Sequence, residues 1–359
     1  CGLSANTNVP SNDDADGDTS GEVVEAPGEN ATDEEINAFI TAASSNPDKM
    51  VIKYASTSAD LNGQAYLRAA RKFLQTLKEE LGDKIEIQYY MNSTFGGTAD
   101  AVLGGLQNNT FELTDWPLGS FAEFTNAFQP LDVPYLVTSN DESYELLTGP
   151  AGDLMTEKCI AETGLKPLYY GIIGMRQFTN SKHEIVTPDD LKGLKIRAQN
   201  NSVQVKGLSA FGCSISTMSF SEVFTSLQQG TIDGLDHTPS VVVANGWQEL
   251  AKHFSLTEHF TIPDPVFVSK VWFDGLSAEN QEAVLEAGKK FSDVWNNEIW
   301  PEATEDGMKA MKEQGVEIVE VDKALFEEAV KPVVDKFLAD ASEDQKALYD
   351  LLTKTRENY

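Results

Sequence analysis

The histidines and the glutamate near position 255 are the first candidates for chemistry in this sequence. His253, Glu258 and His259 are of the types that hold a metal ion. On a helix, however, a gap of six residues does not place two ligands on one face. Ordinary polar and capping roles are therefore the expectation for them, and we predict no metal and no cofactor. The many other carboxylates single out no acid–base pair.

The short motifs that mark common enzymes are absent from the sequence. It contains no phosphate loop of the Walker type, no Gly-x-Gly-x-x-Gly, no Gly-x-Ser-x-Gly and no His-Glu-x-x-His. Cys159 and Cys213 show neither the Cys-x-x-Cys spacing nor a zinc-ligand spacing. These observations predict a protein that is not an enzyme and that carries two buried thiols, although the sequence leaves their pairing open.

The net charge limits the partners that the chain can have. Its 359 residues include 57 acidic and only 27 basic ones, for a formal charge of −30. Phosphate neutralisation needs clustered Lys and Arg, so we expect no nucleic acid partner and no direct electrostatic attraction to an anionic membrane. No stretch reaches the roughly 18 apolar residues of a membrane helix.

The acidic charge is concentrated at the start of the chain. Residues 1–48 hold eleven acids and no Lys or Arg, which leaves −19 for the remainder. Few large apolar side chains occur there, so we expect disorder from residue 2 to about 32 and treat residues 1–48 as an acidic tether. With Cys1 at its start, the segment resembles a mature bacterial lipoprotein, in which Cys1 carries the lipid; the sequence does not show whether it is acylated.

From Met50 onward the pattern alternates between strands and helices, which indicates an α/β protein. The expected strands are 50–57, 85–90, 110–118, 166–173, 176–181 and 194–198, and the expected helices include 63–81, 96–109 and 219–230. Residues 277–314 are almost continuously compatible with a helix that Pro301 kinks or divides. So long a helix needs more than one surface to lie on.

Five segments in order resemble the extracytoplasmic solute receptors of tripartite ATP-independent periplasmic (TRAP) transporters, the DctP type. They cover roughly residues 50–345 and read STFGGTADAVLGGLQNNTFELT, NAFQPLDVPYLV, GMRQFTNSKHEIVTPDDLKGLKIRAQNN, SISTMSFSEVFTSLQQGTIDGLDHTP and HFSLTEHFTIPDPVFVSKVWFDGLSAENQEAV. The resemblance implies a two-lobe fold like that of type II periplasmic binding proteins, with crossing hinge strands and a long helix spanning both lobes. Lobe one would be 50–173 plus 263–302, and lobe two 174–262 plus 303–359.

The resemblance also assigns two arginines to the ligand. Arg197 matches the family arginine that pairs with the ligand carboxylate, and a guanidinium suits that role because it forms two parallel charge-assisted hydrogen bonds. Arg176 matches the second arginine of the pattern, which either reaches other ligand oxygens or braces the lobe through a carboxylate.

The remaining candidates come from the same comparison of motifs. Phe220 matches the aromatic residue that flanks the ligand, and His237 stands where the family usually has Asn, in a loop that reads Asp236, His237, Thr238. Because imidazole can take a proton near neutral pH, we expect a different distal ligand group. In lobe one the candidates are Trp116, Ser120, Asp60 and either Thr94 or Phe95.

Together these features predict the solute-binding subunit of a TRAP transporter. Its two lobes would close on the carboxylate anion of a small organic acid, a class that includes the sugar acids. It would deliver this ligand to small and large membrane permease subunits that are driven by an ion gradient. It would be extracytoplasmic and anchored to the bacterial membrane by the lipid on Cys1. Two alternatives stay open: a solute-binding lipoprotein of an ATP-driven importer, and an enzyme on the same two-lobe fold.

Overall fold

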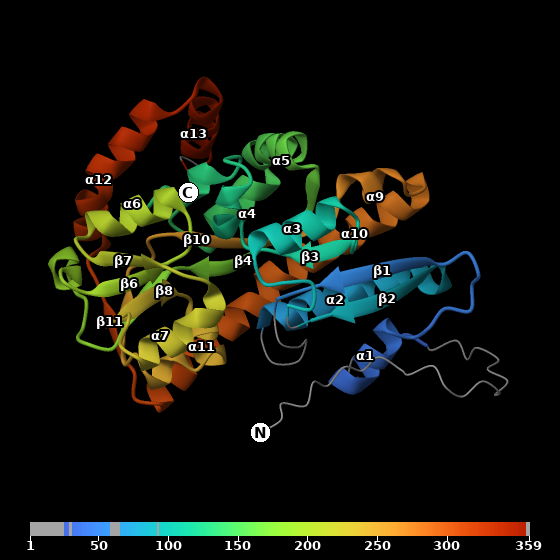
Figure 1. The fold of residues 1–359 in the computed structure, drawn as a ribbon, viewed down its shortest axis with the longest axis horizontal. Coiled ribbons are helices and arrows are strands. Elements are labelled where there is room, and N and C mark those ends of the chain that lie inside the picture. Colours follow the sequence, from blue (N-terminus) through green and yellow to red (C-terminus); the bar gives the residue numbers. More distant parts are fainter. Residues whose placement is uncertain (1–24, 29–30, 58–64, 92, 357–359) are drawn as a thin grey trace.

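Two β-sheets organise the molecule (Figure 1). The computed structural model describes residues 25–28, 31–57, 65–91 and 93–356. One sheet has the strand order β2-β1-β3-β10-β4 and the other the order β11-β9-β5-β8-β6-β7. We call the part of the chain around the first sheet lobe one and the part around the second sheet lobe two.

Parallel strands meet at one edge of each sheet. Lobe one contains β1 (Met50–Ala55), β2 (Ile85–Tyr90), β3 (Leu113–Asp115), β4 (Leu165–Met175) and β10 (Thr261–Ser269). Lobe two contains β5 (Gln177–Asn180), β6 (Lys195–Ala198), β7 (Ser214–Thr217), β8 (Gly234–His237), β9 (His253–Leu256) and β11 (Glu317–Glu320). Strand β1 runs parallel to β2 and β3, and β6 runs parallel to β7 and β8. The loops after these strands are the usual place for a ligand site.

Helices cover both faces of the lobe-one sheet. On one face lie α2 (Ala65–Leu81) and α10 (Ala278–Val294), and on the other lie α3 (Ala99–Gln107), α4 (Asn140–Thr148) and α5 (Pro150–Thr163). The helical spacing of Phe73, Leu77 and Leu81 gives α2 one apolar face, and all three side chains are buried. A short helix, α9 (Lys270–Asp274), follows β10.

A long helical segment runs along both lobes. It consists of α10, a π-helical turn over Trp295–Ile299 and α11 (Trp300–Glu313). The turn ends just before Pro301, whose missing N–H interrupts the regular hydrogen-bond pattern. Helix α10 packs against α2 and β4, whereas α11 packs against α8 (Pro239–Ala244) of lobe two. This confirms the predicted interruption and the predicted long helix across both lobes.

Lobe two has its own apolar core. Helices α6 (Ser202–Ala210) and α12 (Lys323–Asp340) bury Leu208, Phe326 and Val330 with Ile196 of the sheet. Helix α7 (Val223–Gln228) begins after a 3-10 turn whose capping residue is Ser219. The capped turn predicted at Thr187 is also present, and it precedes β6.

The chain crosses between the lobes in two adjacent strand pairs. Strand β4 of lobe one continues through Arg176 into β5 of lobe two, and β9 of lobe two continues into β10 of lobe one. The backbone N–H of Arg176 donates to the carbonyl of Phe260 over 2.7 Å, and the N–H of His259 donates to the carbonyl of Arg176 over 3.3 Å. The two crossings are therefore hydrogen-bonded side by side, as the expected hinge strands require.

The folded part begins earlier than the predicted tether boundary at residue 48. Helix α1 (Asp33–Ile40) has a complete capping box between Thr32 and Glu35, and it packs against α2. Phe39 is 6 % exposed and Ile40 is fully buried. Three of the acids in this segment, Asp33, Glu34 and Glu35, lie in the first turn of the helix, where negative charge is stabilising. Within the described ranges, no helix has the length and apolar character to span a membrane.

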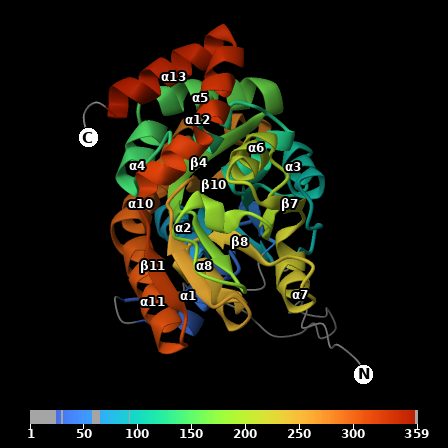
Figure 2. The ribbon, with the colours of Figure 1, turned by 90° about the vertical axis from the view of Figure 1, so that its left-hand side faces the viewer.

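The last helix corrects the predicted boundary of lobe two. Helix α13 (Glu343–Arg356) packs against α4 and α5 of lobe one, in both views of the ribbon (Figures 1 and 2). Its apolar side chains Leu348, Tyr349 and Leu352 are buried in the lobe-one core. An amphipathic pattern shows which face of a helix is buried but not which lobe covers it. Residues 343–356 therefore belong with lobe one, whereas α12 packs against α6 of lobe two.

The two internal cysteines match the expectation of separate thiols. Cys159 and Cys213 are both buried and free. Burial raises the pKa of each thiol to about 12, so neither is a reactive thiolate near neutral pH.

Two glycines in helix interiors should respond oppositely to alanine. In α11, a Cβ on Gly307 would lie 2.6 Å from the backbone nitrogen of Ser240 in α8. In α3, a Cβ on Gly104 would meet nothing within 4 Å. We expect Gly307→Ala to lower the free energy of unfolding by about 1–3 kcal/mol through overpacking. Gly104→Ala should leave it unchanged or raise it by up to about 1 kcal/mol. Urea denaturation of the two variants measures the difference, and an equal response would contradict the close α8–α11 packing.

Candidate functional site

A cavity of about 520 Å³ lies between the two lobes at the carboxyl ends of their parallel strands. The lobe-one side includes Thr57 after β1, Asp115 and Trp116 at the end of β3, and Asp264 of β10. The lobe-two side includes Arg197 of β6, Met218 after β7 and His237 of β8. Of the predicted site residues, Arg197, Phe220, His237, Trp116 and Ser120 line this cavity.

Arg197 is a buried cation with an unused donor. Its side chain is 3 % exposed, and its Nε and Nη2 both donate to the carbonyl of Met218, over 3.3 and 3.0 Å. Its Nη1 has no hydrogen-bond partner among the described residues. Burial and the neighbouring charge of Arg176 lower the pKa of Arg197 to about 10, so the guanidinium remains charged at neutral pH. A buried charge without a partner is costly, and an anion in the cavity would remove that cost.

Arg176 and Asp236 lie behind the cavity wall rather than in it. Arg176 is 1 % exposed, and its Nη1 donates to the backbone carbonyl and to Oδ1 of Asp236, over 2.9 and 3.2 Å. His259 donates from Nε2 to Oδ2 of Asp236 over 3.1 Å, since an ionised carboxylate can only accept. Burial lowers the pKa of His259, so its ring is neutral at neutral pH. Burial alone would raise the pKa of Asp236, but Arg176 and His259 hold it well below its usual range. Asp236 therefore balances the charge of Arg176, which leaves the positive charge of Arg197 at the cavity.

His237 offers the cavity a neutral donor instead of a titrating group. The backbone N–H of Thr238 donates to Nδ1 over 2.9 Å, which leaves the ring proton on Nε2. Burial and the charge of Arg176 lower the pKa of His237 well below its usual range. This finding corrects the expectation that His237 takes a proton near neutral pH. Phe220, 41 % exposed, and Trp247 pack against the ring with centroids 6.1 and 5.9 Å away.

The lobe-one wall carries acceptors and one further free donor. Asp115 is half-buried and its Oδ1 accepts the hydroxyl of Tyr54 over 2.7 Å. Asp264 is 6 % exposed and its Oδ1 has no partner among the described residues. Trp116 is 9 % exposed, and its indole Nε1 likewise has no partner there.

The two lobes touch along one rim of the cavity. Ser120 donates to Oε1 of Gln199 over 3.2 Å. Asn201 donates to the carbonyl of Gly119 and to Oδ2 of Asp132, over 2.8 and 2.7 Å, and Gln204 donates to Oδ1 of Asp132 over 2.8 Å. A Cβ on Gly119 would lie 2.6 Å from Oε1 of Gln199 and 2.8 Å from Nε2 of Gln204, so a side chain there would displace the two amides from the rim. These contacts describe a closed arrangement of the lobes.

Other predicted residues lie elsewhere. Asp60 and Cys1 fall outside the described residues. Phe95 packs between Tyr90 and Phe111, with centroids 4.8 and 5.1 Å away, and Thr94 donates to the carbonyl of Met91.

The three candidate metal ligands each have a different partner. His253 contacts Glu317, Glu258 contacts Lys323, and His259 contacts Asp236. Their side chains therefore do not converge on one point.

Four further residues line the cavity although no sequence motif points to them: Asp115, Asp264, Glu123 and Gln199. For Asp264 a signal was present: it is an acid within the otherwise apolar strand TIPDPVFVS, all of whose residues are buried. A charged side chain at such a position needs a partner or a function.

Neutralising Asp236 should destabilise the protein. In Asp236→Asn, Arg176 becomes a buried charge without a counterion, and we expect a loss of about 3–5 kcal/mol in the free energy of unfolding. Because the native pKa of Asp236 is depressed, its contribution is present above the ordinary carboxyl pKa and is lost as the pH falls below it. The difference from the unmodified protein in urea denaturation should therefore shrink below about pH 4.

An exposed acid of the same lobe provides the control. The Asp189 side chain is 78 % exposed in its pair with Lys192, so Asp189→Asn should change the free energy of unfolding by less than about 1 kcal/mol. A similar response of both variants would contradict the buried ion pair.

Solved structures with this arrangement of lobes are known. The chain aligns with a TRAP periplasmic solute binding protein from a Sulfitobacter species, with bound β-D-galacturonate, at a TM-score of 0.78 and 30 % identity, over 84 % of this chain and 99 % of the other. It also aligns with one from Anaerococcus prevotii, with bound D-glucuronate, at a TM-score of 0.80 and 26 % identity, over 87 % and 99 % of the two chains.

Sequence comparison gives the same assignment. The chain is 33 % identical over 274 residues, 76 % of its length and 83 % of the relative, to the 2,3-diketo-L-gulonate-binding periplasmic protein YiaO of Escherichia coli. It is 26 % identical over 80 % of its length to the C4-dicarboxylate-binding periplasmic protein DctP of Rhodobacter capsulatus, covering 86 % of that relative. Residues 56–340 match the DctP family, described as bacterial extracellular solute-binding protein, family 7. The chain therefore belongs to the DctP family and is a solute-binding protein of the TRAP type.

Proposed function

We propose that this chain binds a sugar acid between its lobes, with the carboxylate held by Arg197. The observation that carries the proposal is the buried guanidinium of Arg197, a residue that lines the cavity and whose Nη1 has no partner among the described residues. A carboxylate would satisfy both the donor and the charge, and the planar guanidinium would fix its orientation. The neutral Nε2–H of His237 is a second donor at this end.

The polarity of the cavity supports a ligand that has hydroxyl groups as well as one carboxylate. On the lobe-two side, Arg197 and His237 supply hydrogen-bond donors. On the lobe-one side, Asp115 and Asp264 supply carboxyl oxygens and Trp116 supplies an indole N–H. The similar proteins named with galacturonate, glucuronate and 2,3-diketo-L-gulonate bind molecules of this composition. Phe220 supplies an apolar surface beside the carboxylate end.

Binding would act by favouring the closed arrangement of the lobes. A ligand shifts such an equilibrium only by the difference in its affinity for the two arrangements. Arg197 and His237 belong to lobe two, and Asp115, Trp116 and Asp264 belong to lobe one, so a ligand contacts both sets only when the lobes are closed. The rim contacts of Asp132 with Asn201 and Gln204 would form in the same step.

The closed receptor would deliver its ligand unchanged to the small and large permease subunits of a TRAP transporter. The permease partner and an extracytoplasmic location are inferred from the family to which the chain belongs. In this role the chain catalyses no reaction. Recovery of the bound acid in chemically unchanged form would separate the receptor from an enzyme on the same fold.

Replacing Arg197 by lysine tests the proposal. In Arg197→Lys the charge remains but the planar pair of donors is lost, so we expect D-glucuronate binding to weaken by about 2–5 kcal/mol. Isothermal titration calorimetry with the full chain measures the change.

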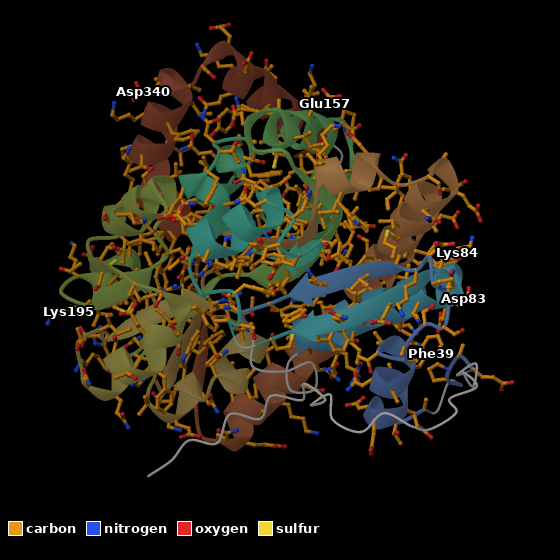
Figure 3. The ribbon with its side chains drawn as sticks, turned by 45° about the vertical axis from the view of Figure 1, so that its right-hand side comes forward. Phe39, Asp83, Lys84, Glu157, Lys195 and Asp340 are labelled. Atoms are coloured by element: carbon orange, nitrogen blue, oxygen red, sulfur yellow. The ribbon has the colours of Figure 1, made fainter. Side chains whose placement is uncertain are left out.

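The matched control removes a charge from the same strand. Lys195 begins β6 and is exposed at the outer edge of lobe two (Figure 3). Lys195→Gln should leave the affinity within about 0.5 kcal/mol of the unmodified protein. Unchanged glucuronate binding in Arg197→Lys would exclude the arginine clamp.

A further inference from the structure

The two acids of the lobe-one wall are adjacent in the sheet. Strand β3 pairs with β10 in antiparallel register, and Asp115 is opposite Val266. Asp264 lies two residues before Val266, so its side chain is on the same face of the sheet as that of Asp115. Tyr54 is on this face too, because it pairs with Leu113 in parallel register. Both acids line the cavity where this face opens into it.

The lobe-one wall of the cavity contains a carboxyl oxygen and an indole N–H that have no hydrogen-bond partner among the described residues. Oδ1 of Asp264 lacks a donor, and Nε1 of Trp116 lacks an acceptor, among the described residues. Both side chains are more than nine-tenths buried, and both line the cavity. Buried polar groups are normally hydrogen-bonded, so an unpaired carboxyl oxygen and an unpaired indole N–H on two residues of one cavity wall indicate that a ligand completes them.

The chemistry of these atoms favours hydroxyl groups. A hydroxyl both donates and accepts, so one or two of them can satisfy a carboxyl oxygen and an indole N–H together. An ammonium group only donates and would leave Trp116 unpaired. A carboxylate only accepts and would face Asp115 and Asp264. Among the described residues that line the cavity, Arg197 is the sole Lys or Arg, and it belongs to the opposite lobe.

We propose that Asp115, Asp264 and Trp116 form a hydroxyl-recognition subsite that admits polyhydroxy acids with one carboxylate and rejects diacids. This inference rests on the proposed function, because it assumes that the ligand's carboxylate occupies Arg197. It assigns the discrimination between sugar acids and dicarboxylates, both of which are named as ligands of similar proteins, to these three residues.

The electrostatic environment of the pair is consistent with this role. Burial and the nearby Asp115 raise the pKa of Asp264 well above its usual range, and burial raises that of Asp115 even though Tyr54 donates to it. Two carboxyls in one site resist a second negative charge. The pair then carries one charge and one proton, so a further carboxylate from a ligand would still meet a like charge. A neutral hydroxyl would not, and it can donate to the ionised carboxyl or accept from the protonated one.

A series of ligands that differ at one end tests the subsite. D-Gluconate, D-glucarate and 6-amino-6-deoxy-D-gluconate share one carbon chain and end in a hydroxyl, a carboxylate and an ammonium, respectively. D-Erythronate and meso-tartrate form a second pair on a shorter carbon chain, the former ending in a hydroxyl and the latter in a carboxylate. Isothermal titration calorimetry with the full chain at neutral pH gives the dissociation constants. We expect each aldonate to bind at least about tenfold more tightly than its diacid, because the diacid leaves buried polar groups unpaired.

Two substitutions connect the preference to the acids. In Asp264→Asn and Asp115→Asn the repulsion falls, so the ratio of diacid to aldonate dissociation constants should decrease by about tenfold or more. Asp100→Asn removes an exposed acid of α3 that does not line the cavity, and it should leave the ratio unchanged. The melting temperature of each unliganded variant reports whether it is folded, and the ligand series on the unmodified chain needs no variant at all.

The outcomes separate this inference from the proposed function. Equal or tighter binding of the diacids or of the amino acid by the unmodified chain overturns the subsite, and so does a ratio that neither substitution changes. In those cases a dependence on Arg197 would leave the carboxylate clamp standing. Binding of neutral sugars in place of every acid, with no effect of Arg197→Lys, would instead overturn the proposed function.

Discussion

The uncompensated charge of Arg197 is the constraint on which the rest of this site depends. Arg176 and Arg197 lie close together in the interior, and Asp236 pairs with Arg176 and His259 but not with Arg197. A second buried carboxylate beside Arg197 would make the lobe more stable but would leave no attraction for an anion. The protein thus keeps one positive charge buried and unpaired. The burial of this charge lowers the stability of lobe two. The apolar core of the lobe and the contacts among Asp236, His259 and Arg176 offset that loss.

The fold places that charge where a ligand can use it. Arg197 is near the carboxyl end of β6, and Asp115 ends β3, so each lobe turns the same kind of sheet edge toward the cavity. The crossing strands carry Arg176 between the lobes and hydrogen-bond to each other there. The helices α10 and α11 pack on both lobes along one side. Any movement of the lobes is therefore expected at the strand crossings, at the π-helical turn between α10 and α11, and at the junction between α12 on lobe two and α13 on lobe one.

Sequence patterns predicted the local elements better than their assembly. The α/β alternation, the interrupted long helix and the capped turn at Thr187 follow from periodicity, proline chemistry and capping, which are local. Family motifs placed Arg197 and His237 at the cavity, because both residues lie near the carboxyl ends of β6 and β8, which run parallel to each other. Asp115 and Asp264 were missed because they are distant in sequence and meet only through β3–β10 pairing. Helix α13 was assigned to the wrong lobe for the same reason, since its burial depends on α4 and α5.

The rim contacts show how closure can be specific without being tight in the absence of ligand. Asp132 accepts hydrogen bonds from Asn201 and Gln204, yet burial raises its pKa to about 7, so placing this carboxylate in the closed interface has a cost. Opening would return it to water, which offsets much of what the two amides contribute. The rim contacts therefore set the geometry in which the lobes meet, and the burial of Asp132 opposes part of what its hydrogen bonds contribute. The difference must come from the cavity, where Arg197 on one wall and Asp264 on the other lack partners until a molecule spans both.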